Sequence, residues 1–392
     1  MLALLLARAN VPVVLLESGS DFDRDFRGDS LHPAIMEVLD QLGLADDCLA
    51  LPHSEIRTAA LPTKPPLSLS FGELRGRFQF MTLMPQRHFL EFLTEKASQY
   101  PAFTLIMNAT VRELILTNGQ VVGVRYSSGN SLHEIRAVLT VGADGRSSTV
   151  RRKADLASAA YGSAIDVLWL RLSRKTADPE GIVAGGGEGM MILAADRRDL
   201  WQIGVIIPKG TYRTMRSEGV ELLRRAIAAA IPVLADRVRE LEDWHQVAML
   251  SVRADRVKKW YRPGLLVIGD AAHVMSPVAG NGINYAIADA VAAANILAAP
   301  LGNGSLTTDH LAAVQRRRAW PTRVTQFAVA RVQDRLLAAF SGGRTRPPRL
   351  VRIALCLPLI RRQAIRIAAY GIRPERVDPD LADPPRQTKE RQ

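Results

Sequence analysis

The residues best suited to chemistry lie between positions 269 and 290, where the sequence reads GDAAHVMSPVAGNGINYAIADA. The apolar run at 265–268 predicts a short buried strand before them, and residues 283 to about 297 predict a helix of small residues after them. Two glycines at the start of that helix let backbone N–H groups approach a ligand, and the helix dipole adds partial positive charge there. Asp270, at the end of the strand, can accept hydrogen bonds from a chain of hydroxyl groups. The pattern predicts a site for a polar, elongated and partly anionic ligand, although an ordinary strand-to-helix connection is the alternative.

A second motif lies about 125 residues earlier, where residues 141–152 read VGADGRSSTVRR after the apolar run 137–140. Asp144 and Gly145 favour a tight turn, and the serines that follow can cap a helix. The arginines of the motif, Arg146, Arg151 and Arg152, suit a ligand that carries phosphate. The segment is therefore a second candidate for ligand binding.

These two motifs, in this order, resemble those of the FAD-dependent aromatic hydroxylases, the single-component flavoprotein monooxygenases typified by p-hydroxybenzoate hydroxylase. The resemblance implies that Asp270 holds the flavin ribitol and that Asp144 and Gly145 support FAD and the nicotinamide cofactor. It also implies that residues 280–284 lie against the flavin ring. The cofactor-binding residues predicted around the later motif are Gly269, Asp270, Pro277, Gly280, Gly282 and Asn284.

Three further residues complete the predicted cofactor site. Glu17 ends the apolar run 11–16, where a dinucleotide-binding fold places an acid on the adenosine ribose. Residues 25–33 resemble the mobile loop of the family, with Arg27 as the phosphate contact. Residues 84–93 resemble the helix whose first polar residue touches FAD; Gln86 is predicted for that role, with Arg87 as the alternative.

The beginning of the chain departs from the family pattern. A Rossmann-type FAD site uses a first strand and a GxGxxG turn, and counting back from Glu17 puts the last glycine just before Met1. Residues 2–10 then correspond to the rest of the first helix, with Asn10 as its stop signal. Either the start codon was assigned to an internal methionine or the chain is truncated. As written, the chain is expected to bind FAD poorly, and the missing strand leaves two strands of the sheet without their shared neighbour.

Composition excludes several other classes. The two cysteines, Cys48 and Cys356, supply neither a disulfide framework nor a metal site, and no apolar run reaches 18 residues. The formal net charge of +12 is spread along the late part of the chain without a recognisable nucleic-acid module. We therefore predict a cytoplasmic protein that does not bind nucleic acid and whose oligomeric state is open. Residues 350–369 mix basic and apolar side chains, as segments that lie on a membrane surface do, so peripheral membrane contact is an alternative.

The predicted fold is α/β: a Rossmann-like FAD-binding domain with an inserted β-sheet substrate domain and a helical C-terminal region. The first part of the FAD-binding domain is predicted over 1–160, the substrate domain over 161–258, and the second FAD-binding part over 259–340. A basic helical segment and tail are predicted over 341–392. Strands are expected at 167–172, 190–194 and 201–208, a helix at 218–241, and a hairpin turn at Asn118-Gly119.

The resemblance implies a FAD-dependent NAD(P)H monooxygenase that hydroxylates or epoxidises an aromatic or lipophilic polycyclic substrate with O2 through a flavin hydroperoxide. The sequence identifies no catalytic acid or base, because neither His273 nor His32 is in a setting that demands one. Two alternatives stay open: a FAD-dependent reductase or dehydrogenase of the same superfamily, and a non-catalytic remnant that no longer binds flavin. The identity of the substrate and the choice between NADH and NADPH are not encoded in recognisable motifs.

Overall fold

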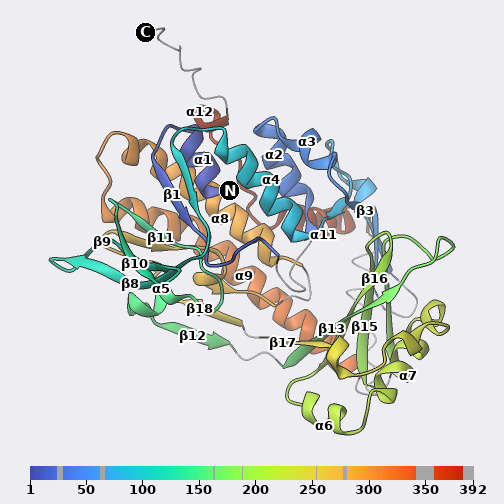
Figure 1. Cartoon of the computed structure of the whole chain (residues 1–392). Helices are drawn as coiled ribbons and strands as arrows, with labels where there is room; N and C mark the ends of the chain where they lie inside the picture. Colours follow the sequence, from blue (N-terminus) through green and yellow to red (C-terminus); the bar gives the residue numbers. More distant parts are fainter. Residues whose placement is uncertain are drawn as a thin grey trace.

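The structure is a computed structural model that describes residues 1–23, 30–61, 67–161, 164–187, 189–252, 254–276, 280–340 and 357–382 (Figure 1). Helices and sheets are both present, as the sequence predicts. In chain order, the helices are α1 (Leu2–Arg8), α2 (Pro33–Gln41), α3 (Ala45–Leu49), α4 (Gln86–Ser98), α5 (Thr149–Lys153), α6 (Tyr212–Ser217), α7 (Glu221–Ala230), α8 (Gly282–Gly302), α9 (Thr308–Phe340), α11 (Pro358–Tyr370) and α12 (Pro379–Ala382).

The strands form several small sheets and one larger sheet. They are β1 (Val13–Leu16), β2 (Ser30–Leu31), β3 (Ser54–Ile56), β4 (Thr58–Leu61), β5 (Leu67–Ser70), β6 (Met81–Leu83), β7 (Phe103–Ile106), β8 (Ala109–Thr117), β9 (Gln120–Ser128), β10 (Ser131–Arg136), β11 (Thr140–Gly142), β12 (Ser158–Tyr161), β13 (Ile165–Ser173), β14 (Ile182–Gly187), β15 (Met190–Asp196), β16 (Leu200–Pro208), β17 (Ala248–Ser251), β18 (Ala254–Val257), β19 (Tyr261–Arg262), β20 (Leu265–Val267) and β21 (His273–Val274).

Two pairs of parallel strands carry the predicted binding motifs. β1 pairs with β7, and β11 pairs with β20, which also pairs with the antiparallel β19. Within the described residues, β1 and β11 each have a strand partner on one side only. Parallel strands place the turns that follow them at the same edge of a sheet. The pairing of β11 with β20 therefore brings the two predicted motifs together.

Helix α8 is the core helix of this half of the molecule (Figure 1). One side of it, including Ile287 and Val291, belongs to an apolar cluster with α1, α2 and α4. A second side, including Ala293 and Leu297, belongs to another cluster with β20 and α9. Its small residues allow this close packing on both sides. α8 is long and apolar enough to span a membrane by length and composition, but 56% of that stretch is buried inside the fold.

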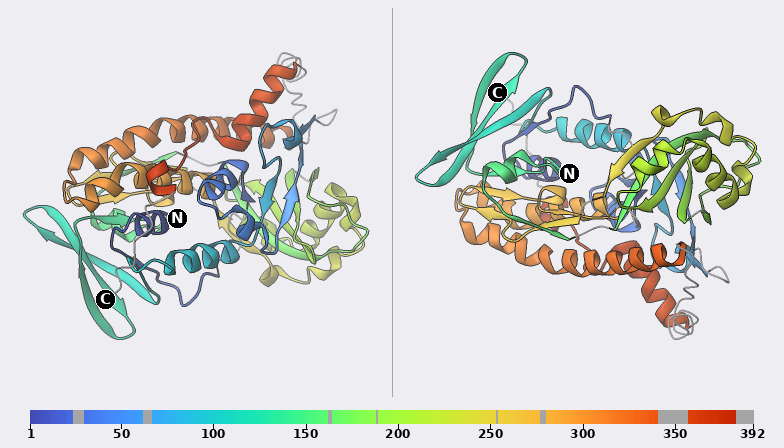
Figure 2. Two further views of the ribbon diagram at one scale, coloured as in Figure 1. Left: turned by 90° about the horizontal axis from the view of Figure 1, so that it is seen from above. Right: turned by 90° about the horizontal axis from the view of Figure 1, so that it is seen from below.

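The five-stranded sheet lies within the predicted substrate domain and has the order β14-β15-β16-β13-β17. Side chains on one face, the outer face, pack against α7 through residues such as Leu170, Ile203 and Leu223. The views in Figure 2 agree that α6 and α7 lie on the side of the sheet away from the rest of the molecule. The alternate side chains therefore form an inner face that turns toward the cofactor-binding part. The apolar residues of the inner face are Ile165, Val167, Trp169, Met191, Leu193, Ile206, Leu250 and Val252.

Two predictions about local structure can be compared directly. The hairpin at Asn118-Gly119 is confirmed: both residues have positive φ, of 49° and 77°, and they join β8 to β9. The prediction of one helix over 218–241 is wrong. Helix α7 ends at Ala230, and short 3-10 turns follow it. Pro232 explains the difference, since proline has no N–H to continue the helix and disfavours helical backbone in the residue before it.

Gly264 fixes the turn that leads into β20, and it gives a test of this geometry. Its φ is +74°, and a Cβ atom there would lie 1.9 Å from the carbonyl oxygen of Val121. Gly119 is a matched control, with φ +77° and nothing within 4 Å of a Cβ. We expect Gly119→Ala to lower the free energy of unfolding by about 1 kcal/mol, through backbone strain alone. Gly264→Ala should cost about 3 kcal/mol or more, because the backbone must also move.

Denaturant unfolding of the two variants beside the wild type measures both effects. Equal losses of stability in the two variants would contradict the close contact between Gly264 and Val121.

Candidate cofactor site

The two predicted motifs lie side by side in the structure. Residues 140–142 of β11 pair in register with residues 265–267 of β20, and the N–H of Ile268 donates to the carbonyl of Gly142 at 3.0 Å. Arg151 links the turns that follow, since its Nη1 donates to the carbonyl of Ala271 at 3.2 Å and its Nη2 to that of Arg146 at 3.0 Å. The motif that contains Asp144 and the motif that contains Asp270 thus form one structural unit.

The structure assigns local roles to several polar groups of the earlier motif. The carboxylate of Asp144 accepts hydrogen bonds from the Ser148 hydroxyl and, at 3.0 Å, from the N–H of Val150, so it caps the start of α5. Arg151 is buried and also lies 3.6 Å from the Asp255 carboxylate. These contacts engage the guanidinium of Arg151 inside the protein and give no support to a contact with a ligand phosphate, which stays a prediction. Gly145 has φ +77° and open space where a Cβ would be, which fits the predicted turn.

The turn at Gly269 and Asp270 is held from behind by α8. Gly269 is buried with φ +58°, and its N–H donates to the carboxylate of Asp289 at 3.0 Å. His273, in the strand that follows, contacts the same carboxylate with its Nε2 at 2.5 Å. Asp270 itself is half-buried in the short 3-10 turn Gly269–Ala271. The carboxylate of Asp289 thus fixes the backbone from which Asp270 projects.

The N-terminus of α8 has the features of an oxygen-binding site. Its N-cap residue, Asn281, makes no side-chain capping bond, so the first N–H groups of the helix lack that partner. Nothing lies within 4 Å of the position of a Cβ at Gly282, the first residue of the helix. Gly280, just before it, has φ +61°, and a Cβ there would lie 2.4 Å from the Ser30 hydroxyl. The helix therefore offers partial positive charge beside a glycine-lined approach.

Asn284 attaches residues 30–32 to this helix. Its side-chain oxygen accepts the N–H of His32 at 2.9 Å, and its amide nitrogen donates at 3.1 Å to the carbonyls of Ser30 and Gly280. Ser30 and His32 lie about 250 residues before Asn284 in the sequence, whereas Gly280 belongs to the turn just before α8. The side chain of Asn284 is fully engaged in these bonds, so it positions the site through the backbone.

His32 is a polar group that the sequence did not identify as part of a site. Its Nδ1 lies 2.9 Å from the carbonyl of Ala368, which requires a hydrogen on Nδ1 and leaves Nε2 as an acceptor. Nε2 is buried, and within the described part of the chain it has no hydrogen-bond partner. It lies 3.9 Å from the position of a Cβ at Gly280. Burial lowers the pKa of His32 to about 4, although the bond to Ala368 opposes the shift. His32 is therefore a neutral acceptor at neutral pH.

The remaining predicted residues are placed at separate points around this centre. Glu17 follows β1 and accepts the N–H of Gly19 at 2.8 Å. Gln86 is the first residue of α4, and its Oε1 is buried without a hydrogen-bond partner. Arg27 and Pro277 lie outside the described residues. The structure thus joins Gly269, Gly280 and Asn284 around α8, whereas no hydrogen bond connects Glu17 or Gln86 to that group within the described residues.

Comparison with known proteins identifies the family. The FAD-binding domain family matches residues 1–328. The 6-methylpretetramide 4-monooxygenase of Streptomyces rimosus is 33% identical over 391 residues, which cover 97% of this chain and 91% of that protein. The chain belongs to the FAD-binding domain family. The predicted activity, FAD-dependent hydroxylation of an aromatic or polycyclic substrate with NAD(P)H and O2, is confirmed at the level of this family.

Solved structures confirm the fold of this flavoprotein. PqsL, a probable FAD-dependent monooxygenase from Pseudomonas aeruginosa, superposes with a TM-score of 0.73 at 21% identity, over 87% of this chain and 93% of that chain. The anhydrotetracycline hydroxylase OxyS from Streptomyces rimosus gives a TM-score of 0.75 at 21% identity, over 95% of this chain and 74% of that chain. The predicted Rossmann-like FAD-binding fold is therefore correct.

The residues around α8 fit the chemistry of FAD. The flavin ring carries carbonyl oxygens and an imide N–H along one edge, and its binding therefore needs both donors and an acceptor. The uncapped N–H groups of α8 supply donors, and the buried Nε2 of His32 supplies an acceptor without a partner. The buried Oε1 of Gln86 is a second acceptor of this kind. Leaving the two buried side-chain acceptors, Nε2 of His32 and Oε1 of Gln86, without a partner would be costly.

The low pKa of His32 predicts a pH dependence of stability. A histidine with a folded pKa of about 4 and an unfolded pKa near 6.5 favours the folded state above pH 6.5, and this contribution is lost as the pH falls toward 4. Between pH 7.5 and pH 5 the loss should be about 2 kcal/mol, because each pKa unit is worth about 1.4 kcal/mol. His32→Gln, which does not titrate, should lack this part of the dependence.

Denaturant unfolding of the apoprotein at the two pH values, for the wild type and His32→Gln, measures the difference. The same pH dependence in both proteins would contradict the neutral, buried state of His32.

Proposed function

We propose that the chain hydroxylates a polycyclic aromatic substrate that lies between the N-terminus of α8 and the inner face of the five-stranded sheet. The observation that carries the proposal is the composition of that inner face. Eight of its side chains are apolar or aromatic and form one cluster, whereas Arg171 and Gln202 lie on the same face further along β13 and β16. Helices α6 and α7 cover the outer face, and α9 contacts the sheet at β15 (Figure 2). A flat apolar molecule is the kind of ligand that such a surface favours.

Trp169 is the proposed polar anchor of this surface. Its ring lies across β16 because Gly204 faces it, with the position of a Cβ at Gly204 only 3.0 Å from the ring. The indole N–H of Trp169 is buried and has no hydrogen-bond partner among the residues that the structure describes. An oxygen atom of a substrate, such as the carbonyl or hydroxyl oxygen of a polyketide, would satisfy this donor. The 6-methylpretetramide acted on by the Streptomyces rimosus relative is therefore a suitable first substrate to test.

The cofactor-binding roles of the individual residues are proposals as well. Asp270 would hold the ribityl hydroxyl groups of FAD, Glu17 the adenosine ribose, and Gln86 a further polar group of the cofactor. The first N–H groups of α8, beginning at Gly282, would bind the carbonyl oxygens of the ring, and the Nε2 of His32 would accept its N–H. When bound, FAD would supply the redox chemistry: NAD(P)H provides two electrons, one oxygen atom of O2 goes to the substrate, and the other leaves as water.

The residues of the protein contribute orientation and electrostatics to this reaction. The N-terminal dipole of α8 stabilises negative charge that develops beside Gly280 and Gly282. The apolar inner face excludes water and holds the aromatic plane. His32 is unsuited to act as a general base, because a pKa of about 4 lies roughly six units below that of an ordinary phenol. We therefore assign it hydrogen bonding and assign no catalytic acid or base.

The proposed reaction can be tested directly. Purified protein reconstituted with FAD should oxidise NADH or NADPH faster in the presence of 6-methylpretetramide, and mass spectrometry should detect a product heavier by one oxygen atom. Omission of O2 should abolish the product. Oxidation of NAD(P)H that no polycyclic phenol accelerates, with no oxygenated product, would refute the proposed substrate class.

A pair of tryptophans tests the role of the inner face. Trp169 and Trp244 both have a buried indole N–H without a partner, but Trp244 packs with Tyr212 on the outer side of the sheet. Trp169→Phe should raise the Kd of a bound oxygen-bearing polycyclic substrate about 5- to 10-fold, the worth of one hydrogen bond. Trp244→Phe should leave that Kd unchanged. The Kd is measured by substrate-induced changes in flavin absorbance. Equal Kd values for both variants and the wild type would show that Trp169 does not bind the substrate.

We also propose that α11 allows peripheral contact with an anionic membrane, while a cytoplasmic location stays a prediction. Leu357, Leu359 and Ile360 are exposed at the start of α11, Leu359 by 80%, and Arg361 and Arg362 follow them. Exposed apolar residues beside arginines suit the surface of a bilayer that contains acidic lipids. Helix α11, red in Figure 2, projects from one side of the molecule in both views.

Sedimentation with vesicles of phosphatidylcholine and phosphatidylserine tests this contact. The wild type should co-sediment at low salt, and Leu359→Glu should reduce the bound fraction at least about threefold, because it buries no apolar surface and adds negative charge. Leu132→Glu, a change at an exposed leucine on β10, is the control and should bind like the wild type. Equal binding by both variants, or none by the wild type, would refute the proposal.

A further inference from the structure

A chain of buried charged residues connects the turn at Gly269 to the C-terminal part of the protein. Asp289, on α8, is completely buried. Its Oδ2 accepts the N–H of Gly269 at 3.0 Å and contacts His273 at 2.5 Å, while its Oδ1 accepts the Nε of Arg318 at 2.9 Å. Burial alone would raise the pKa of Asp289, but His273 and Arg318 outweigh it and hold the pKa below its ordinary value. The carboxylate is therefore charged in the folded protein.

The chain continues from Arg318 to Glu375. Nη1 of Arg318 lies 3.1 Å from the carboxylate of Glu375, which also receives Nη2 of Arg317 at 2.8 Å. Arg318 is 1% exposed, and Glu375 is buried as well. Arg318 thus lies buried between two carboxylates, and the partly exposed Arg317 supplies the second positive charge at Glu375. The network joins α8, α9 and the segment that follows α11.

The segment around Glu375 is itself fixed to the cofactor-binding part. The Asn295 side chain, on α8, donates to the carbonyl of Arg376 at 2.7 Å and accepts the N–H of Asp378 at 3.0 Å. The N–H of Val377 donates to Gln41, at the end of α2, at 2.8 Å. The region that matches the FAD-binding domain family ends at residue 328. A part of the chain beyond that region therefore packs on the elements that carry the cofactor site.

Stability alone is a weak reason for such a network. Moving charges out of water is costly, and apolar residues of similar size often stabilise a core as well as a buried ion pair does. What apolar residues cannot do is accept the N–H of Gly269 in one fixed direction. That bond holds a turn with φ +58°, and the next residue is Asp270. The network thus has a geometric consequence at the point where the cofactor is proposed to bind.

We propose that Asp289 and Glu375 are positioning residues of the flavin site. Asp289 fixes the Gly269–Asp270 turn directly, and Glu375 acts through Arg318, which it keeps aligned with Asp289. The inference rests on the proposed role of Asp270 as a FAD ligand. It implies that residues beyond the family domain contribute to FAD affinity although they do not touch the cofactor.

The experiment measures the Kd of FAD by titration of the apoprotein, followed by the quenching of flavin fluorescence. Asp289→Asn replaces the charged acceptor with an amide that cannot satisfy Gly269, His273 and Arg318 together. We expect it to raise the Kd about 10- to 100-fold, since 1.4 kcal/mol corresponds to a factor of ten. Glu375→Gln should raise the Kd about 3- to 10-fold. The effect is smaller because the lost ion pair is with Arg318 and reaches Asp289 only through that arginine. The double variant should resemble Asp289→Asn, because the two residues act through one network.

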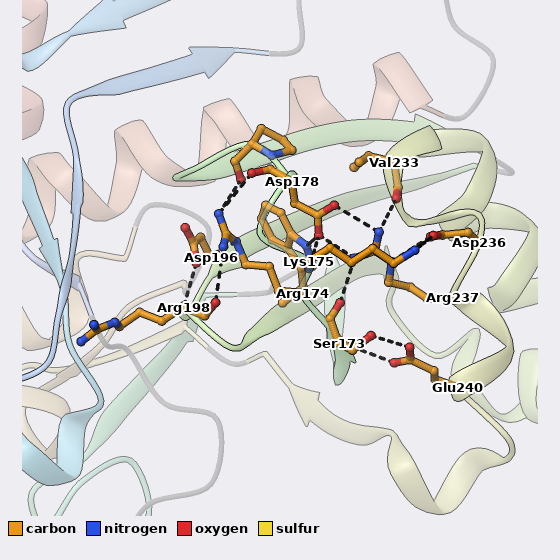
Figure 3. Close-up of polar contacts among 12 residues, drawn as sticks. Ser173, Arg174, Lys175, Asp178, Asp196, Arg198, Val233, Asp236, Arg237 and Glu240 are labelled. Atoms are coloured by element: carbon orange, nitrogen blue, oxygen red, sulfur yellow. Dashed lines mark hydrogen bonds and ion pairs between the residues drawn. The ribbon is translucent and has the colours of Figure 1, made fainter.

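A buried ion pair in the substrate domain supplies the matched control. Asp178 faces Arg237, whose Nη2 donates to its Oδ1 at 3.1 Å, and it accepts the indole N–H of Trp201 at 2.9 Å (Figure 3). Both partners are almost fully buried, and Arg237 holds the pKa of Asp178 far below its ordinary value. Asp178→Asn should lower the thermal unfolding temperature of the apoprotein as Asp289→Asn does, yet it should leave the Kd of FAD unchanged.

The two measurements separate the outcomes. A lower unfolding temperature with an unchanged Kd in Asp289→Asn and Glu375→Gln would show a purely structural network and overturn the inference alone. Equal increases in Kd for Asp178→Asn and Asp289→Asn would also overturn it, because general destabilisation would then account for both. A wild-type protein that takes up no FAD would overturn the proposed function together with the inference.

Discussion

The close packing of α8 on both sides determines where the rest of this protein can lie. Alanines and other small residues let two apolar clusters approach the helix, one with α1, α2 and α4 and the other with β20 and α9. A helix held in this way cannot shift along its axis without disturbing both clusters. Its N-terminus, where the dipole and the uncapped N–H groups are concentrated, therefore has a fixed position. The proposed cofactor site is built around that point.

Polar groups then attach distant segments to the fixed helix. Asn284 binds residues 30–32, and Asp289 binds the turn at Gly269, each through backbone N–H groups. Both side chains are buried and have no polar group of their own left to contact a ligand freely. Their contribution is to hold backbone segments that do face the site. The buried charges of Arg318 and Glu375 also help to hold this backbone, because they keep the carboxylate of Asp289 in one orientation.

The five-stranded sheet separates two tasks by alternation of its side chains. Along β13, Leu168 and Leu170 point to the outer face and help form a core with α7, whereas Val167 and Trp169 point to the inner face. Because the outer face already supplies the stability of this domain, the inner face is free to vary in shape and chemistry. The proposed substrate surface on one side of the sheet, with a structural core on the other, would let relatives share the fold and differ in substrate.

The sequence by itself determined the features that depend on local chemistry. The β20 strand, the small-residue helix after it, the Asn118-Gly119 hairpin and the three strands predicted between 167 and 208 follow from periodicity and turn residues. The family motifs around Asp144 and Asp270 followed from residue types at fixed spacing. Only the tertiary structure decided which groups meet. The unpaired Nε2 of His32, the occupied guanidinium of Arg151 and the link from Asp289 to Glu375 all join residues far apart in the chain. Local patterns fix backbone preferences, but the partner of a buried polar group depends on packing between segments, which no local pattern contains.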